Sequence, residues 1–274
     1  MVRPHPVGAV NRKWFMSRSD IKWRVNTNPR FTVLELGEYM AADDGPRETM
    51  LRDMRYERLA RTLIYRHLRL AVTKFVASPT RDRSILEHCR LNLEDEKSSA
   101  TSTQQGENLA YELRALDAFE NSLNALGLGG LNFLPAPPAS PLKIEGVTVS
   151  VQPTAHILIS RPRGSDLAGA LIVDLAKGTS PKTPEAIAKM ANGMVHAAVL
   201  IHEYVANALP SADTKASPEH SIVFHSHRQE RVCAPASYRR MLRNVEAVCR
   251  NIARSWDGIK PPPAYDPAFA RTRR

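Results

Sequence analysis

A proline-rich stretch, PAPPASP at 135–141, divides the chain into two parts with different hydrophobic periods. Proline fixes one backbone dihedral and lacks an amide donor, so a run of prolines forms a stiff linker rather than part of a helix or sheet. Before the stretch, apolar residues recur at the spacing of a helix, and after it they alternate as in strands. We therefore predict a helical N-terminal region joined to a core of mixed α/β class.

Three segments before the proline stretch are predicted to be helices. They lie at 47–76, 84–93 and about 107–126, and the glycines of 127–130 end the third one in the way that glycine commonly ends helices. The residues at 95–106 are polar and low in complexity, which favours a mobile loop.

After the proline stretch the pattern predicts strands, a buried helix, a hairpin and an amphipathic last helix. In chain order these are strands at 142–147, 148–160 and 170–176, a helix at 184–208, hairpin strands at 221–227 and 231–234, and a helix at about 236–256. The predicted fold is a central mixed sheet flanked by helices. The expected organisation is a basic arm at 1–46, a helical region at 47–134 that packs on the core, an α/β core at 142–258 and a tail at 259–274.

The formal net charge of +10 is concentrated at the two ends of the sequence. Residues 1–76 carry 15 Lys and Arg against 8 Asp and Glu, residues 228–274 carry 11 against 4, and the part between has a slight acidic excess. A clustered basic field attracts the phosphates of nucleic acid, an anionic membrane surface or an acidic protein. An arginine-rich surface that only aids solubility gives the same counts.

Two sets of arginines are candidates for contact with nucleic acid. One set falls on a broad stripe of the helix predicted at 47–76, and the other lies off the apolar face of the last helix. They are Arg55, Arg58, Arg66 and Arg69 in the first set and Arg239, Arg240 and Arg243 in the second. Trp14, Phe15 and Trp23 lie among the basic residues of the arm, where they could stack on bases or dock onto their own domain.

The sequence lacks the motifs of several enzyme classes. There is no phosphate-binding GxxxxGK[ST], no GxGxxG, no GxSxG and no HExxH. Cys89, Cys233 and Cys249 are far apart, which argues against a disulfide framework or a zinc ribbon. His225 and His227 form a possible metal half-site, although exposed or core histidines are the more frequent outcome. No apolar run reaches the length of a membrane helix, so we expect no membrane partner and a cytoplasmic location.

The order of predicted elements from 107 to 256 resembles the core of the PD-(D/E)XK nuclease superfamily, the restriction-endonuclease-like fold. VQPT at 151–154 and VDLAK at 173–177 stand where that family has a Pro-Asp strand and a strand with Asp/Glu-X-Lys. The resemblance implies carboxylates that hold Mg²⁺ and a lysine that activates water, the last being Lys177.

The sequence departs from the family pattern at both acidic positions. Thr154 stands at the position of the first aspartate, and Asp174 precedes Lys177 by three residues rather than two. A relocated catalytic set would use Asp174 as metal ligand and Lys177 as the water-activating residue, with Glu112 or Glu145 as a second ligand. These departures favour a non-catalytic protein that binds nucleic acid or a protein partner and needs no cofactor. The alternatives are a Mg²⁺-dependent nuclease with relocated carboxylates and a homodimeric structural or interaction protein.

Overall fold

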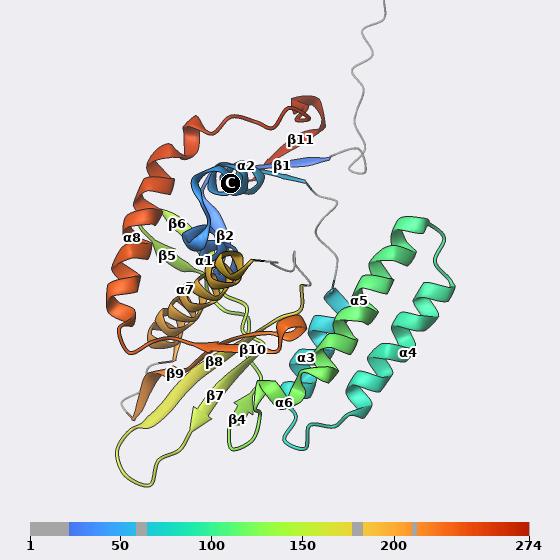
Figure 1. Ribbon diagram of the computed structural model, residues 1–274, viewed down its shortest axis with the longest axis vertical. Coiled ribbons are helices and arrows are strands. Elements are labelled where there is room, and N and C mark those ends of the chain that lie inside the picture. The colour runs from blue at the N-terminus through green and yellow to red at the C-terminus, as the bar shows by residue number, and fades with distance from the viewer. Residues whose placement is uncertain (1–21, 59–64, 177–182, 210–212, 274) are drawn as a thin grey trace, which may run out of the picture.

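A mixed five-stranded β-sheet lies at the centre of the fold, with helices on both of its faces (Figure 1). The computed structural model describes residues 22–58, 65–176, 183–209 and 213–273. The sheet has the order β10-β9-β8-β7-β4, with β4 (Asn132–Leu134), β7 (Ala155–Ile159), β8 (Asp166–Asp174), β9 (Thr214–His225) and β10 (Glu230–Cys233). This arrangement confirms the predicted α/β class.

Helix α7 (Pro184–Ala208) connects β8 and β9, which run parallel. A parallel pair needs such a crossover because the chain must return to the same end of the sheet. Thr183 caps the start of the helix, and Pro184 lies in the first turn, where a missing amide costs nothing. The other neighbouring strands of this sheet are antiparallel. As a result, Asp174 and His225 lie side by side at the ends of β8 and β9.

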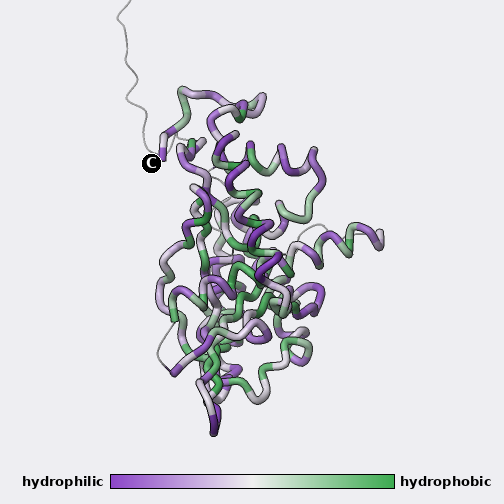
Figure 2. The backbone as a smooth tube through the Cα atoms, turned by 90° about the vertical axis from the view of Figure 1, so that its left-hand side faces the viewer, coloured by the Kyte–Doolittle hydropathy of each residue, from purple (hydrophilic) through white to green (hydrophobic). Residues whose placement is uncertain are grey.

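The two faces of the central sheet pack against different helices. Leu171 and Val173 point to a core formed with the helices that precede β4, and Ala170 and Ile172 point to a core formed with the remaining helices. The first group is α3 (Arg66–Ala77), α4 (Ser84–Ser98), α5 (Thr103–Asn121) and α6 (Leu123–Leu126), and the second includes α1 (Val33–Ala41), α7 and α8 (Tyr238–Ser255). Figure 2 shows hydrophobic residues gathered toward the middle of the molecule. None of the described helices has both the length and the apolar character needed to cross a membrane.

A second sheet of three strands lies beside α1 and α8. Its order is β2-β6-β5, with β2 (Arg30–Thr32), β5 (Leu142–Ile144) and β6 (Val147–Ser150). Strand β2 leads directly into α1 through a capping box, in which Thr32 and Glu35 each accept a hydrogen bond from the backbone amide of the other. The capping box fixes the direction in which the chain leaves β2, and the pairing of Arg30 with Thr148 of β6 fixes the backbone position of Arg30.

A third sheet joins the two basic ends of the sequence. Its order is β11-β1-β3, with β1 (Trp23–Asn26), β3 (Tyr56–Arg58) and β11 (Ala270–Arg273), and α2 (Asp44–Arg55) leads into β3. Strands β1 and β11 are parallel neighbours, at the upper end of the view in Figure 1. Trp256, which follows α8, donates its indole N–H to the backbone carbonyl of Asn26 over 3.0 Å. Strand pairing therefore brings Arg24 of β1 next to Arg271 and Arg273 of β11, from opposite ends of the sequence.

Three predictions of local structure are wrong. The helix predicted at 47–76 is interrupted, because 56–58 forms β3 and pairs with β1. The loop predicted at 95–106 is largely helical, since α4 continues to Ser98 and Ser102 caps the start of α5. The single strand predicted at 148–160 is two strands, β6 and β7, which belong to different sheets.

The predicted arm and tail contribute to the folded structure where they are described. Trp23 is 5% exposed, so its side chain docks onto its own domain. Trp14 and Phe15 lie outside the described residues. Residues 270–273, within the predicted tail, form β11.

Candidate anion-binding site

The carboxylates proposed from the sequence as catalytic have separate local partners. Asp174, the last residue of β8, accepts a hydrogen bond from the amide of Ala176 over 3.0 Å. Lys177 lies outside the described residues. Among the residues that the structure describes, no group of three or more His, Cys, Asp or Glu side chains is placed to hold a metal ion. The described part of the chain thus gives no support to Asp174 as the centre of a metal site.

Glu112 stabilises the start of a neighbouring helix. It is 6% exposed on α5, and its carboxylate accepts a hydrogen bond from the amide of Leu68, in the first turn of α3, over 3.4 Å. Burial raises the pKa of Glu112, while the hydrogen bonds from the amides of Leu68 and Tyr65 oppose that rise. A carboxylate at a helix N-terminus satisfies amides that lack partners within the helix, so Glu112 has a structural role in α3.

Glu145 is exposed in the tight turn between β5 and β6. It accepts a hydrogen bond from Arg250 of α8 over 3.0 Å, and this bond lowers the pKa of Glu145. The backbone of Glu145 has a φ of 46° and Gly146 has a φ of 84°, a conformation typical of two-residue hairpin turns. The turn places Glu145 in a different sheet from Asp174.

Thr154 fills a structural position beside β8. Its hydroxyl accepts a hydrogen bond from the amide of Val173 over 3.0 Å, and its own amide donates to the carbonyl of Leu171 over 2.7 Å. The side chain is therefore engaged with the backbone of β8.

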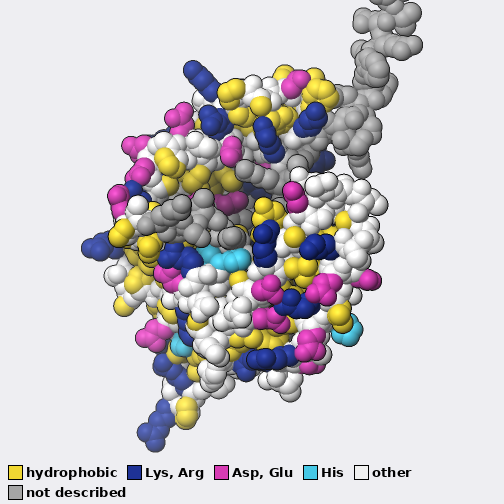
Figure 3. Space-filling model, turned by 45° about the vertical axis from the view of Figure 1, so that its right-hand side comes forward, with side chains coloured by type: hydrophobic (Ala, Val, Ile, Leu, Met, Phe, Trp, Pro, Cys, Tyr) yellow, Lys and Arg dark blue, Asp and Glu magenta, His cyan; other side chains and the backbone are white. Residues whose placement is uncertain are grey.

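Asp174 and His225 form a polar cluster where β8 and β9 end. His225 is 5% exposed, and its Nδ1 has no hydrogen-bond partner among the described residues. Burial lowers the pKa of His225, and the nearby carboxylate of Asp174 opposes that effect. The rings of His225 and His227 are 6.4 Å apart between centroids. Figure 3 shows histidine side chains beside charged ones near the middle of one face of the molecule.

The arginines predicted to form one stripe are divided between two parts of the fold. Arg55 is largely buried and lies 3.6 Å from Asp257, and Arg58 stacks over the ring of Trp23 at 4.9 Å. Arg66 and Arg69 are exposed on α3, beyond β3 and the undescribed residues 59–64. The prediction of a single arginine stripe is therefore wrong. The second predicted set is exposed on α8 and comprises Arg239, Arg240 and Arg243.

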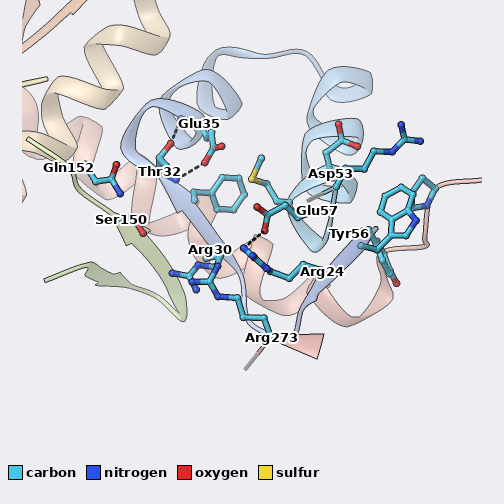
Figure 4. A pocket seen from close by; sticks show the side chains of 15 residues that line it. Arg24, Arg30, Thr32, Glu35, Asp53, Tyr56, Glu57, Ser150, Gln152 and Arg273 are labelled. Carbon is cyan, nitrogen blue, oxygen red and sulfur yellow. Dashed lines mark hydrogen bonds and ion pairs between the residues drawn. The ribbon is translucent and has the colours of Figure 1, made fainter. Parts of the chain in front are cut away.

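A pocket of about 550 Å³ lies between the second and third sheets, and arginines from three strands line it. Arg24 comes from β1, Arg30 from β2 and Arg273 from β11. Figure 4 shows the three side chains gathered at one side of the pocket. Arg58 also lines the pocket, so one of the predicted nucleic-acid residues belongs to this site.

Within the described part of the chain, two of the three gathered arginines form no ion pair with a carboxylate. Arg24 donates a hydrogen bond to Glu57 over 3.2 Å. No Asp or Glu among the described residues forms an ion pair with Arg30 or Arg273. Burial lowers the pKa of Arg273, the like charges of Arg30 and Arg24 lower it further, and the carboxylate of Glu57 opposes these effects. Because positive charges are crowded here, a bound anion would reduce the repulsion among them.

Polar groups that accept or donate hydrogen bonds line other parts of the same pocket. Ser150 and Gln152 lie at or after the end of β6, and Thr32 and Glu35 belong to the capping box of α1. In the view of Figure 4, Glu35 and Asp53 lie on the side away from Arg30 and Arg273. The pocket therefore has a cationic side and a side that contains carboxylates.

Arg24, Arg30 and Arg273 are not among the site residues predicted from the sequence. All three lie in the two ends of the sequence where Lys and Arg outnumber Asp and Glu. Identifying them as one site also requires the pairing of β1 with β11. That pairing is a long-range contact, which local sequence patterns do not encode. No protein-family model, curated protein or solved structure matches the chain.

Proposed function

We propose that the protein binds nucleic acid through phosphate groups held in the arginine pocket, and that it does so without cutting the strand. The observation that carries this proposal is the meeting of Arg24, Arg30 and Arg273, from three strands, in one pocket where Arg30 and Arg273 have no carboxylate partner among the described residues. We call these three side chains the arginine triad.

Guanidinium groups suit phosphate for geometric and electrostatic reasons. Each presents several N–H donors in a planar fork that matches two phosphate oxygens, and each keeps its charge at any physiological pH. The backbone of β1, β2 and β11 holds the three Cα positions, so little ordering is needed when a ligand binds. A bound phosphate would also relieve the repulsion among Arg24, Arg30 and Arg273.

The surroundings of the pocket favour a polymeric ligand. Arg58 lines the same pocket, and Arg271 lies opposite Arg24 in the β1–β11 pairing. Such a field attracts a polyanion over a distance of about a Debye length, roughly 8 to 10 Å at moderate salt. A chain of phosphates therefore gains from residues around the pocket as well as from the triad.

Binding without cleavage is supported by the separate partners of the predicted carboxylates. Metal-assisted cleavage of a phosphodiester needs oxygen ligands that converge on one or two divalent ions. Glu112 instead accepts from the backbone of α3, and Glu145 is paired with Arg250. Neither described interaction brings these groups to Asp174.

The binding test compares two double variants that each remove two positive charges. Arg30→Ala with Arg273→Ala removes the unpaired members of the triad, and Arg161→Ala with Arg163→Ala changes exposed residues of the β7–β8 loop, at the far end of the molecule in Figure 1. Fluorescence anisotropy with short single-stranded DNA and RNA measures affinity at several salt concentrations. Loss of a charged hydrogen bond costs about 1.5 kcal/mol or more, so the triad variant is expected to bind at least about tenfold more weakly. The loop variant is expected to stay close to the native protein. Equal losses in the two variants would contradict the proposal.

The cleavage test uses end-labelled DNA and RNA with Mg²⁺ or Mn²⁺. The strands are expected to remain intact over times at which binding is complete. Cleavage that depends on the metal and is lost in Asp174→Ala would instead support the nuclease alternative. Lys177→Ala provides a second variant for that alternative.

A further inference from the structure

The charge of the arginine triad bears on which phosphate group it binds best. Of the three gathered arginines, Arg24 is neutralised by Glu57, whereas Arg30 and Arg273 have no ion-pair partner among the described residues. Within the triad, two positive charges are thus left for a ligand, while Arg58, Glu35 and Asp53 also line the pocket. An internal phosphodiester carries one negative charge, while a phosphate monoester carries about 1.5 to 2 negative charges at neutral pH. The triad matches the charge of a monoester more closely.

The carboxylates inside the pocket disfavour an internal segment of strand there, while the basic residues around the pocket attract the rest of the strand. Glu35 and Asp53 also line the pocket, away from Arg30 and Arg273 in the view of Figure 4. An internal segment of strand would bring the next phosphate toward the carboxylate of Glu35, and like charges in a partly enclosed site repel each other. A phosphate at the end of a strand has a neighbouring phosphate on one side only, so it meets less of this repulsion than an internal phosphate.

The same carboxylate side can accept hydrogen bonds from the rest of such a ligand. Glu35 uses Oε2 to accept from the amide of Thr32 over 2.7 Å, and Oε1 has no hydrogen bond to a described residue. Ser150 and Gln152 add a hydroxyl and an amide to the lining. Sugar hydroxyls and the exocyclic amines of bases are donors that these groups can bind. A pocket of about 550 Å³ lies within the range of roughly 300 to 1,000 Å³ that is usual for small-molecule sites.

We infer that the pocket recognises a nucleoside phosphate monoester, with the phosphate on the arginine triad and the sugar or base toward Glu35. This inference rests on the proposed binding of nucleic acid and specifies the part of the strand that is bound. The ligand is then the phosphorylated end of a strand. A free nucleoside monophosphate has the same chemistry and is distinguished by experiment.

The test compares internally labelled single strands that differ only at their ends. One carries a 5′-phosphate, one a 3′-phosphate and one only hydroxyls, and a free nucleoside 5′-monophosphate is titrated as a competitor. A phosphorylated end is expected to bind at least about tenfold more tightly than the hydroxyl strand. Arg30→Ala with Arg273→Ala is expected to remove that preference, and Arg161→Ala with Arg163→Ala is expected to keep it.

A variant at Glu35 tests the role of the carboxylate side. Glu35→Gln retains a side chain that can complete the capping box, so α1 is expected to keep its start. Removal of the negative charge is expected to raise the affinity for the hydroxyl strand more than that for the phosphorylated strand. An unchanged preference in this variant would contradict the role assigned to Glu35.

The outcomes separate this inference from the proposed function. Equal affinity for phosphorylated and hydroxyl strands, with weaker binding by the triad variant, would overturn end recognition and leave nucleic-acid binding in place. Binding of the free monophosphate without binding of any strand would support recognition of a phosphate monoester by the pocket. It would overturn the proposal that the ligand is nucleic acid. No binding of strand or monophosphate would overturn both.

Discussion

Arg24 donates a hydrogen bond to Glu57 over 3.2 Å, and the two residues lie directly opposite each other on β1 and β3. The pairing neutralises one member of the arginine triad and leaves Arg30 and Arg273 to a ligand. Glu57 therefore tunes the charge of the pocket. Glu57 is therefore expected to weaken anion binding, whereas the arginines strengthen it.

Glu57→Gln is expected to strengthen binding of single-stranded nucleic acid by about two- to tenfold at low salt. The change frees the guanidinium of Arg24 and removes a negative charge beside the ligand, which is an effect of about 1 kcal/mol. Anisotropy titrations measure the affinity, with Glu94→Gln in the exposed part of α4 as a control of equal charge change. Weaker binding by Glu57→Gln than by the control would show that Glu57 helps to hold the ligand site.

Gly37→Ala is expected to lower the free energy of unfolding by about 1 to 3 kcal/mol. A Cβ at this position of α1 would collide with the carbonyl oxygen of Gly193 in α7, so the two helices would have to move apart. Gly45→Ala is the control, since a Cβ there meets nothing within 4 Å, and alanine lowers the entropy of the unfolded chain. Urea unfolding of both variants checks the prediction, and equal stability would contradict the close approach of α1 and α7.

The protein is expected to lose stability as the pH falls from about 7.5 to about 5.5. Burial lowers the pKa of His156, whose Nε2 lies 3.0 Å from the hydroxyl of Tyr204. In that pH window the unfolded chain binds more protons at this histidine than the folded chain does, so protons favour unfolding. Urea unfolding at both pH values should give a smaller loss for His156→Gln than for the native protein. The exposed His88→Gln should retain the native loss, and an unchanged loss in His156→Gln would contradict the assignment.

One thiol in the native protein is expected to react quickly with an aromatic disulfide reagent at about pH 8. Burial raises the pKa of Cys249 to about 12 and that of Cys89 to about 11, and Cys233 is partly exposed. Three thiols should react after unfolding. Cys233→Ser should abolish the fast reaction, and fast reaction in that variant would show that a buried cysteine is reached.

The elements with strong local signals were predicted correctly from the sequence. Helix α7 was predicted at 184–208, where Thr183 and Pro184 mark its start, and α8 follows from its regular apolar spacing. The hairpin of β9 and β10 was predicted close to its position. In each case a cap, a turn or a period within the element itself determines the structure.

The elements that depend on distant partners were not predicted. Residues 56–58 extend a helical pattern, yet they form β3 because β1 offers a partner for their backbone. Residues 270–273 become a strand for the same reason. The arginine triad depends on the pairing of β1 with β3 and β11 and on the position of β2. The sequence therefore shows that its residues lie in basic segments, but not that they line one pocket. The resemblance to the PD-(D/E)XK superfamily remains a prediction.

Hydrogen exchange measured by mass spectrometry, with and without a saturating 5′-phosphorylated single strand, tests the location of the binding site most directly. Binding in the arginine pocket should slow exchange in peptides that contain β1, β2 and β11 and leave exchange in the β7–β8 loop unchanged. Protection confined to other elements, such as α3 or α8, would contradict the arginine pocket as the site that holds nucleic acid.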